Sequence, residues 1–178
     1  MGLERWVVER SPVVEAIEHG GDFLDVGCAN GLLLEDIMAW AAGVGHVIMP
    51  HGVDIGPGLV ELARQWLPRF ASNLVVADAW SWEPYRTWDY VFSLVDLCPK
   101  EMTCDWMRRL AGWVAPGGRL IVGSYGSRSR RAEPVDVARL LETCGYDVSG
   151  SALAGEPPIS RFAWTDRVEP IRLDRLGV

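Results

Sequence analysis

The sequence predicts an α/β fold in which a mostly parallel β-sheet lies between two layers of helices. From about residue 10 to residue 145, apolar runs of strand length alternate with segments of helical periodicity, which is typical of βαβ units. Glycine and proline turn signals separate these segments. The length of 178 residues suits one domain over residues 1–178 and leaves no room for a second substantial domain.

The first half of the chain predicts three helices and three strands. Ser11 and Pro12 are typical of the start of a helix, and the pair Gly20 and Gly21 of its end, so residues 1–20 form an N-terminal helical segment. The strands expected next are residues 23–26, 51–55 and 73–77, separated by helices over residues 31–42 and 58–66.

The second half continues the alternation and ends in two consecutive strands. Strands are expected over residues 90–97 and 119–124, with a helix over residues 99–114 and a turn at residues 116–118 between them. A helix over residues 134–144 precedes two final strands, residues 146–153 and 161–167, and residues 170–178 form a loose tail.

Composition and charge exclude several classes of protein. The net charge of −7 argues against a general nucleic-acid binder, which relies on an excess of lysine and arginine. The N-terminus lacks the pattern of a signal peptide, and no apolar run approaches the roughly 18 residues of a membrane span. The four cysteines form no CxxC pair and the histidines no HExxH motif, so we expect no metal site, reduced thiols and a cytoplasmic protein.

The residues that carry chemistry lie just after the predicted strands, because open parallel sheets bind ligands outside the carboxyl ends of their strands. The first strand runs into Asp25 and a turn in which Gly27 and Gly31 permit a close backbone approach to a ligand. The next two strands are followed by Asp54, whose carboxylate suits the two hydroxyls of a ribose, and by Asp78, which suits an adenine amino group. Three acids behind a glycine turn predict a site for a cationic nucleoside.

With these residues the chain resembles the class I S-adenosylmethionine-dependent methyltransferases. Segment FLDVGCANG, residues 23–31, is similar to their first motif, D/E-x-G-x-G-x-G. Four further segments resemble the ribose-binding, adenine-binding, fourth-strand and helix-turn-strand motifs of the family, in the family's order: residues 52–57, 77–79, 88–94 and 110–121.

The resemblance implies a fold, a cofactor and a set of contacts. The fold is a three-layer αβα sandwich whose seven-stranded sheet has the order 3-2-1-4-5-7-6 with the last strand antiparallel, and the cofactor is S-adenosylmethionine. The turn after the first strand lies against the methionine part of the cofactor, Asp25 supports its amino group, and Asp54 holds the ribose. The full set of implied cofactor-binding residues is Asp25, Gly27, Cys28, Ala29, Gly31, Asp54, Ile55, Asp78, Ala79, Trp80, Ser93 and Leu94.

One residue departs from the family's first motif. Ala29 stands where the family has its middle glycine. A Cβ atom is tolerated there if the backbone has a negative φ angle, so under that condition we expect binding to persist.

The acceptor of the methyl group is predicted to be a small molecule, methylated on oxygen or nitrogen. Asp96 and Tyr125, after the fourth and fifth strands, are the candidates for a general base or a hydrogen-bond donor. The arginines from Arg128 onward suit a carboxylate or phosphate, and Trp6 and Arg10 belong to an N-terminal segment that forms a lid. The absence of an Asn/Asp-Pro-Pro-Tyr/Phe motif after the fourth strand counts against methylation of nucleic-acid bases.

Two alternatives remain open at this point. An NAD(P)-dependent oxidoreductase of the Rossmann type shares the glycine turn and the acid after the second strand, although its G-x-G-x-x-G fingerprint is not met from Gly27 onward. A non-catalytic relative that binds the cofactor or a partner protein is the other alternative.

Overall fold

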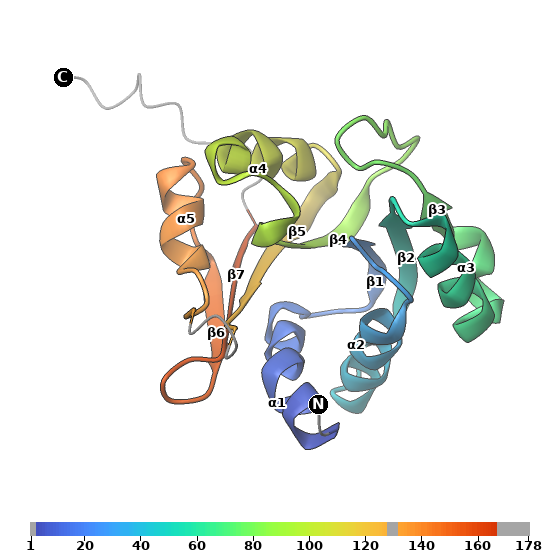
Figure 1. The fold of residues 1–178 in the computed structure, drawn as a ribbon, viewed down its shortest axis with the longest axis horizontal. Coiled ribbons are helices and arrows are strands. Elements are labelled where there is room, and N and C mark those ends of the chain that lie inside the picture. The colour runs from blue at the N-terminus through green and yellow to red at the C-terminus, as the bar shows by residue number, and fades with distance from the viewer. Residues whose placement is uncertain (1–2, 128–131, 167–178) are drawn as a thin grey trace.

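The computed structural model describes residues 3–127 and 132–166, and its centre is one seven-stranded sheet (Figure 1). The strand order β3-β2-β1-β4-β5-β7-β6 confirms the predicted order. The strands are β1 (Gly21–Val26), β2 (Ile48–Asp54), β3 (Leu74–Val76), β4 (Trp88–Leu94), β5 (Val114–Tyr125), β6 (Gly150–Ala154) and β7 (Ser160–Thr165). Pairings among β1 to β5 are parallel, and β7 runs antiparallel to both β5 and β6.

Helices cover both faces of this sheet, which confirms the predicted three layers. They are α1 (Leu3–Arg10), α2 (Leu32–Gly43), α3 (Pro57–Trp66), α4 (Thr103–Ala111) and α5 (Val137–Thr143). Figure 1 shows α4 and α5 on one side and α1 and α2 on the other. Shorter 3₁₀ segments are Ser11–Ala16, Pro68–Asn73, Val95–Leu97 and Lys100–Met102. No helix in the described part of the chain is both long and apolar enough to cross a membrane.

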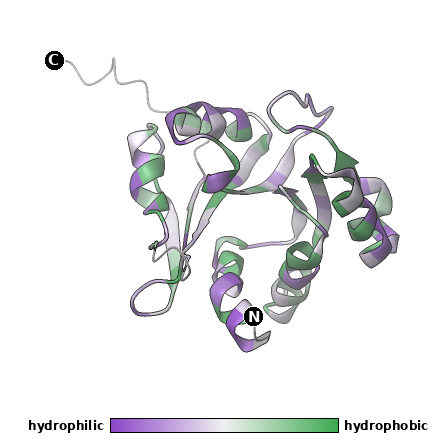
Figure 2. Cartoon of the chain, in the orientation of Figure 1, coloured by the Kyte–Doolittle hydropathy of each residue, from purple (hydrophilic) through white to green (hydrophobic). Residues whose placement is uncertain are grey.

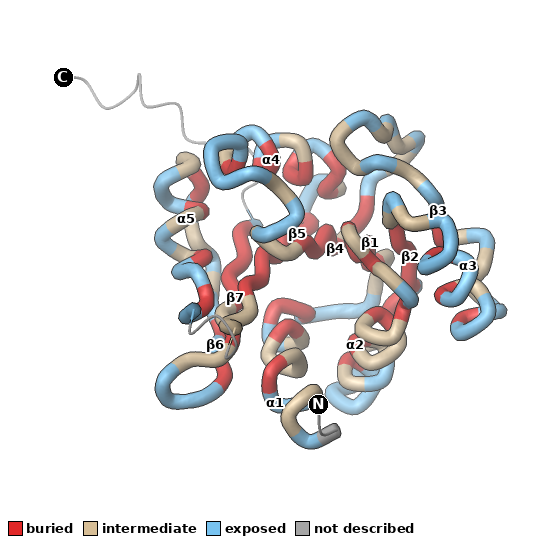
Figure 3. The backbone as a smooth tube through the Cα atoms, viewed as in Figure 1, coloured by how far each residue is buried: buried red, intermediate tan, exposed pale blue. Residues whose placement is uncertain are grey.

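Apolar side chains of the central strands fill two cores, one on each face. Phe23 and Phe92 pack with α2 and α3, whereas Leu24 and Val122 pack with α4 and α5. The central strands alternate between these faces but are buried on both, as Figure 3 shows, because a parallel sheet is covered by helices on each side. Figure 2 shows that the helices carry both hydrophobic and hydrophilic residues, and their buried hydrophobic faces belong to the two cores. Burial of these faces supplies most of the stabilisation.

The N-terminal segment differs from the prediction. The α-helix begins at Leu3 rather than at Ser11, and it ends at Arg10, where a 3₁₀ segment follows. Pro12 explains the change, because its ring removes an amide donor and disfavours a continuous α-helix through this point.

The second strand begins earlier than predicted, at Ile48, and contains Pro50. The Pro50 carbonyl accepts a bond from the Asn73 side chain on the β3 side, at 3.0 Å. Pairing with β3 starts only at Gly52, so the missing amide of Pro50 faces no strand partner. Proline is therefore tolerated inside this strand.

The helices of the second half are shorter than predicted or divided, whereas β5 is longer than predicted. The expected helix over residues 99–114 consists of a 3₁₀ turn followed by α4, and α5 begins at Val137, after its N-cap Asp136. The predicted turn at residues 116–118 lies within β5. There the register shifts, since Trp88 pairs with Val114 and Tyr90 with Arg119, so the intervening β5 residues bulge out.

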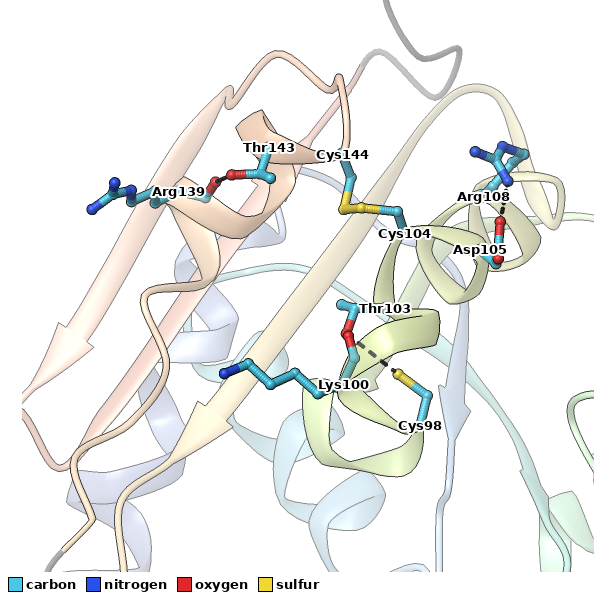
Figure 4. Close-up of a disulfide and its surroundings, with 9 residues drawn as sticks. All are labelled: Cys98, Lys100, Thr103, Cys104, Asp105, Arg108, Arg139, Thr143 and Cys144. Carbon is cyan, nitrogen blue, oxygen red and sulfur yellow. Dashed lines mark hydrogen bonds and ion pairs between the residues drawn. A yellow bond between two sulfur atoms is a disulfide. The ribbon is translucent and has the colours of Figure 1, made fainter.

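The prediction of reduced thiols throughout is wrong for two of the four cysteines. Cys104 at the start of α4 and Cys144 at the end of α5 form a disulfide, with Cα atoms 5.1 Å apart (Figure 4). The two residues are 40 positions apart in sequence. Only the packing of α4 beside α5 on one face of the sheet brings them together, and neither residue type nor spacing indicated it. Cys28 and Cys98 are free thiols.

Candidate functional site

The turn after β1 forms the floor of the candidate site. The amides of Gly27 and Cys28 both donate to the carbonyl of Val53 on β2, at 2.8 and 3.2 Å. Gly27 has a φ of 85°, and a Cβ atom there would lie 2.5 Å from Leu97. Gly31, with a φ of 78°, is the N-cap of α2. These glycines are required by conformation as well as by space, as the sequence predicted.

Asp54 at the end of β2 joins this turn to the next loop. One carboxylate oxygen accepts the amide of Ala29 at 3.0 Å, and the other accepts the amide of Gly56 at 2.8 Å. The carboxylate is half-buried, and each oxygen keeps a further lone pair. Asp54 can therefore hold the loops in place and still accept bonds from the hydroxyls of a ligand.

Ala29 adopts a φ of 47°, the left-handed region that favours glycine. Cofactor binding was expected to persist if this alanine had a negative φ, and that condition is not met. The hydrogen bond from the Ala29 amide to Asp54 stabilises this conformation. The turn thus keeps the shape of a glycine-rich loop at a local cost of about 1–2 kcal/mol.

Asp25 lies one residue before the end of β1 and is almost fully buried, with 3% of its surface exposed. Burial raises the pKa of its carboxyl group to about 7, and the charge of Asp54 adds to the rise. A cation brought beside Asp25 would favour the ionised form and reverse this effect. The position suits a positively charged ligand group.

The other predicted cofactor residues lie along the same edge, with different exposure. Ile55 is 69% exposed, an unusual setting for a large apolar side chain, and Asp78 is exposed. Asp78 accepts the amide of Trp80 at 3.0 Å and so shapes the loop after β3. Ala79 is half-buried, and the Trp80 ring packs in a tilted arrangement against Trp106 of α4, with 5.0 Å between centroids.

Ser93 and Leu94 end β4. The Ser93 hydroxyl is fully buried, donates to the Leu94 carbonyl and accepts the indole N–H of Trp106 at 3.3 Å. Its side chain is thus turned into the core beneath α4. The expected approach of these two residues to the cofactor stays a prediction.

Helix α1 closes the other side of the site, against the end of β5. The guanidinium of Arg10 lies between two rings, 3.8 Å from the Trp6 centroid and 4.6 Å from that of Tyr125. Glu9, 3% exposed, accepts a bond from Arg10 at 2.9 Å. The Trp6 indole donates to Asp36 of α2 at 2.6 Å. Helix α1 is therefore attached both to α2 and to β5.

Glu9 is the residue that sequence reasoning missed. It is an acid among several on a short charged helix, and no local signal separates it from exposed neighbours such as Glu4. Its burial follows from the docking of α1 over the sheet edge.

Comparison with known proteins decides the family. A family model described as a methyltransferase domain matches residues 23–118, more than half of the chain. The chain belongs to the class I S-adenosylmethionine-dependent methyltransferases. It is similar to a trans-aconitate 2-methyltransferase of Methylobacterium radiotolerans, with 32% identity over 139 residues. The match covers 77% of this chain and 48% of that protein, so the chain spans about half the length of this relative.

Solved structures of methyltransferases share the fold. The N-methyltransferase NodS of Bradyrhizobium japonicum WM9, in complex with S-adenosyl-L-homocysteine, superposes with a TM-score of 0.67 at 14% identity, covering 87% of this chain and 82% of that one. A TehB-like methyltransferase of Corynebacterium glutamicum gives a TM-score of 0.65 at 17% identity, covering 91% and 94%.

In this chain, Tyr125 stands out among the predicted acceptor-site residues. Its hydroxyl is buried and has no hydrogen-bond partner among the described residues. Burial raises the pKa of Tyr125; the charge of Arg10 lowers it, and the charges of Asp25, Glu9 and Asp96 add to the rise. The structure thus places Tyr125 near four charged groups of the site. Asp96 itself is exposed, in the 3₁₀ segment after β4.

Two predictions concern residues outside the described ranges and a metal site. Arg128 and the tail over residues 170–178 lie outside the described residues. Within the described ranges, 3–127 and 132–166, no three His, Cys, Asp or Glu side chains are grouped so that they could hold a metal ion.

Proposed function

We propose that this chain transfers the methyl group of S-adenosylmethionine to an oxygen or nitrogen atom of a small-molecule acceptor by in-line displacement. The observation that carries the proposal is the buried Asp25 beside the glycine turn, with Asp54 close enough to raise its pKa further. When bound, the cofactor supplies an electrophilic methyl group and a cationic amino acid end. A buried acid and a floor of tight glycine backbone fit that end of the molecule.

Each residue of the edge has a proposed part in binding. Asp25 accepts a bond from the amino group, directly or through water, while the turn around Gly27 lies against the methionine chain. Asp54 accepts hydrogen bonds from the ribose hydroxyls with the lone pairs that are not used by its two hydrogen bonds to backbone amides. Exposed Ile55 covers one face of the adenine, and Asp78 with Ala79 contacts the adenine edge.

The protein's main contribution to the reaction is alignment. Holding two reactants in the reactive geometry can supply about 7–11 kcal/mol of the barrier, so no catalytic dyad is needed. The Tyr125 hydroxyl is buried and unpartnered. It is the group that orients the acceptor or accepts a hydrogen bond from the O–H or N–H of the acceptor's nucleophile. Asp96 is the second candidate, as a base at the exposed side. Helix α1 acts as a lid that excludes water.

The acceptor class is open, and the relative suggests where to start. That protein is named for trans-aconitate, so carboxylates are the first acceptors to test. Nucleic acid as a partner is not expected. Action in the cytoplasm stays a prediction, and the disulfide removes the part of its basis that rested on reduced thiols.

Calorimetric titration tests the cofactor, and methyl transfer tests the activity. We expect S-adenosylhomocysteine to bind the wild-type protein, Asp54→Ala to weaken binding at least ten-fold, and NADH not to bind. Binding of NADH without S-adenosylhomocysteine would instead favour the oxidoreductase. Cofactor binding without transfer of a labelled methyl group to any cell-extract component would favour a non-catalytic relative.

A further inference from the structure

A cavity of about 470 Å³ lies beside the methyl-transfer site. It is open to solvent on one side and lined by α1, by residues that follow β5 and by the turn between β6 and β7. Its lining includes Arg5, Gly126, Ser127, Glu133 and the turn at residues 155–159. Gly126 directly follows Tyr125, the last residue of β5, so the cavity lies at the same end of β5 as the residue with the unpartnered hydroxyl.

Arg5 is the polar group of this cavity with unused hydrogen-bonding capacity. Its Nε atom is shielded from solvent and has no hydrogen-bond partner among the described residues. Arg5 forms an ion pair with Glu9 in which Arg5 Nη2 and Glu9 Oε1 are 3.9 Å apart, too far for a hydrogen bond, and Glu9 accepts a hydrogen bond from Arg10. The shielded Nε is a cost to the fold, whereas the Arg5 side chain as a whole is 32% exposed, so the rest of its guanidinium can donate to an acceptor atom in the cavity.

The walls of the cavity determine the body of the ligand. Pro157, Pro158 and Ile159 form an apolar side, and Gly126 and Gly155 contribute backbone without side chains. Such walls suit a flat or narrow apolar body rather than a sugar or a peptide with many polar groups.

The rim determines the charge of the ligand. Glu133 and Glu156 are exposed at the cavity and would repel a dianion such as a phosphate monoester. A single carboxylate, in contrast, matches the planar guanidinium of Arg5 and brings only one charge.

We propose that this cavity binds the acceptor, and that the acceptor is a monocarboxylate with a flat apolar body, anchored on Arg5 and directed toward Tyr125. The inference rests on the proposed function, because it places a methyl acceptor beside the cofactor. Arg5 is a specificity-determining residue in it and takes no part in the bond-forming step.

The test compares three acids with their primary amides: cinnamate, hydrocinnamate and indole-3-acetate. Each pair has one body and differs in the charge of its head group. Calorimetric titrations are run on the full chain, with and without S-adenosylhomocysteine, and include cinnamylamine as the cation. We expect at least one acid to bind about ten-fold more tightly than its amide, a difference of about 1.4 kcal/mol.

Variants of Arg5 assign the preference to this residue. Arg5→Met should reduce the preference to within about two-fold, whereas Arg139→Met, which removes the same charge from the exposed face of α5, should retain it. Arg5→Lys keeps the charge and should give an intermediate value, which guards against a folding defect in the methionine variant.

Three outcomes would overturn the proposal: no acid exceeds its amide, the amine binds best, or the preference survives in Arg5→Met. Failure of the proposed function is read separately, from S-adenosylhomocysteine binding to the wild-type protein. The acid preference can still be measured in that case, without the cofactor product.

Discussion

Replacing Asp25 by asparagine should make the protein more stable, and increasingly so as pH rises. The carboxyl group is buried at the end of β1, and burial together with the charge of Asp54 raises its pKa from 3.8 to about 7. Ionised Asp25 is therefore unfavourable in the folded protein. Asparagine has nearly the same shape and carries no charge.

The sign and size follow from proton linkage. The folded protein holds the Asp25 proton more tightly than the unfolded chain, so stability falls as pH rises from about 4 to about 7 and is then constant. At about 1.4 kcal/mol per pKa unit, the full loss is about 4 kcal/mol. More than half of this loss accrues above pH 5, so the advantage of Asp25→Asn should grow by about 2–3 kcal/mol between pH 5 and pH 8.

Urea unfolding of both proteins at pH 5, 6, 7 and 8 measures this difference. The change with pH is the test, because the absolute difference also contains any altered hydrogen bonds. Asp78→Asn, at an exposed carboxylate, reports the part that comes from overall charge. A difference between wild type and Asp25→Asn that is constant over this range would refute the assignment of a raised pKa to Asp25.

Three further predictions concern the turn, the disulfide and the tyrosine. Ala29→Gly should raise the unfolding free energy by about 0.5–1 kcal/mol, because relief of the left-handed strain exceeds the added entropy of the unfolded chain. The control Ala39→Gly in α2 should lower the unfolding free energy by about 1 kcal/mol, and urea midpoints measure both changes. Reduction of the Cys104–Cys144 disulfide should lower the unfolding free energy by about 4 kcal/mol, and dithiothreitol should not affect the double serine variant. Tyr125→Phe should raise the melting temperature, by removing an unpartnered hydroxyl, and lower kcat by a factor of about 10²; an unchanged kcat would assign the hydroxyl no part in transfer.

The sheet and the cofactor edge could be predicted because their signals are local. Asp25, Asp54 and Asp78 each follow an apolar run, and parallel strands bring such positions to one edge whatever the details of the loops. Gly27 and Gly31 adopt positive φ angles that other residues rarely adopt, so their place in the sequence carried structural information.

Features that depend on packing between distant segments could not be predicted. The disulfide joins residues 40 positions apart, and the burial of Glu9 depends on where α1 docks. The φ of Ala29 is likewise stabilised by a hydrogen bond from its amide to Asp54, which lies 25 residues away in the sequence. In each case the residue type allows several environments, and only the tertiary arrangement selects one.

Four unfavourable features of this molecule lie near the proposed site. A buried acid with a raised pKa, an alanine in a left-handed conformation, an unpartnered tyrosine hydroxyl and an unpartnered arginine nitrogen all lie around the carboxyl ends of β1 and β5. Buried polar atoms without a partner also occur away from this region, at Trp88 Nε1 at the start of β4 and at Tyr146 Oη after α5. Natural proteins concentrate such conflicts where binding resolves them. Two of the four face a cation and a carboxylate in the proposals above, so binding of cofactor and acceptor should each stabilise the fold, and melting temperatures with both ligands should exceed those with either alone.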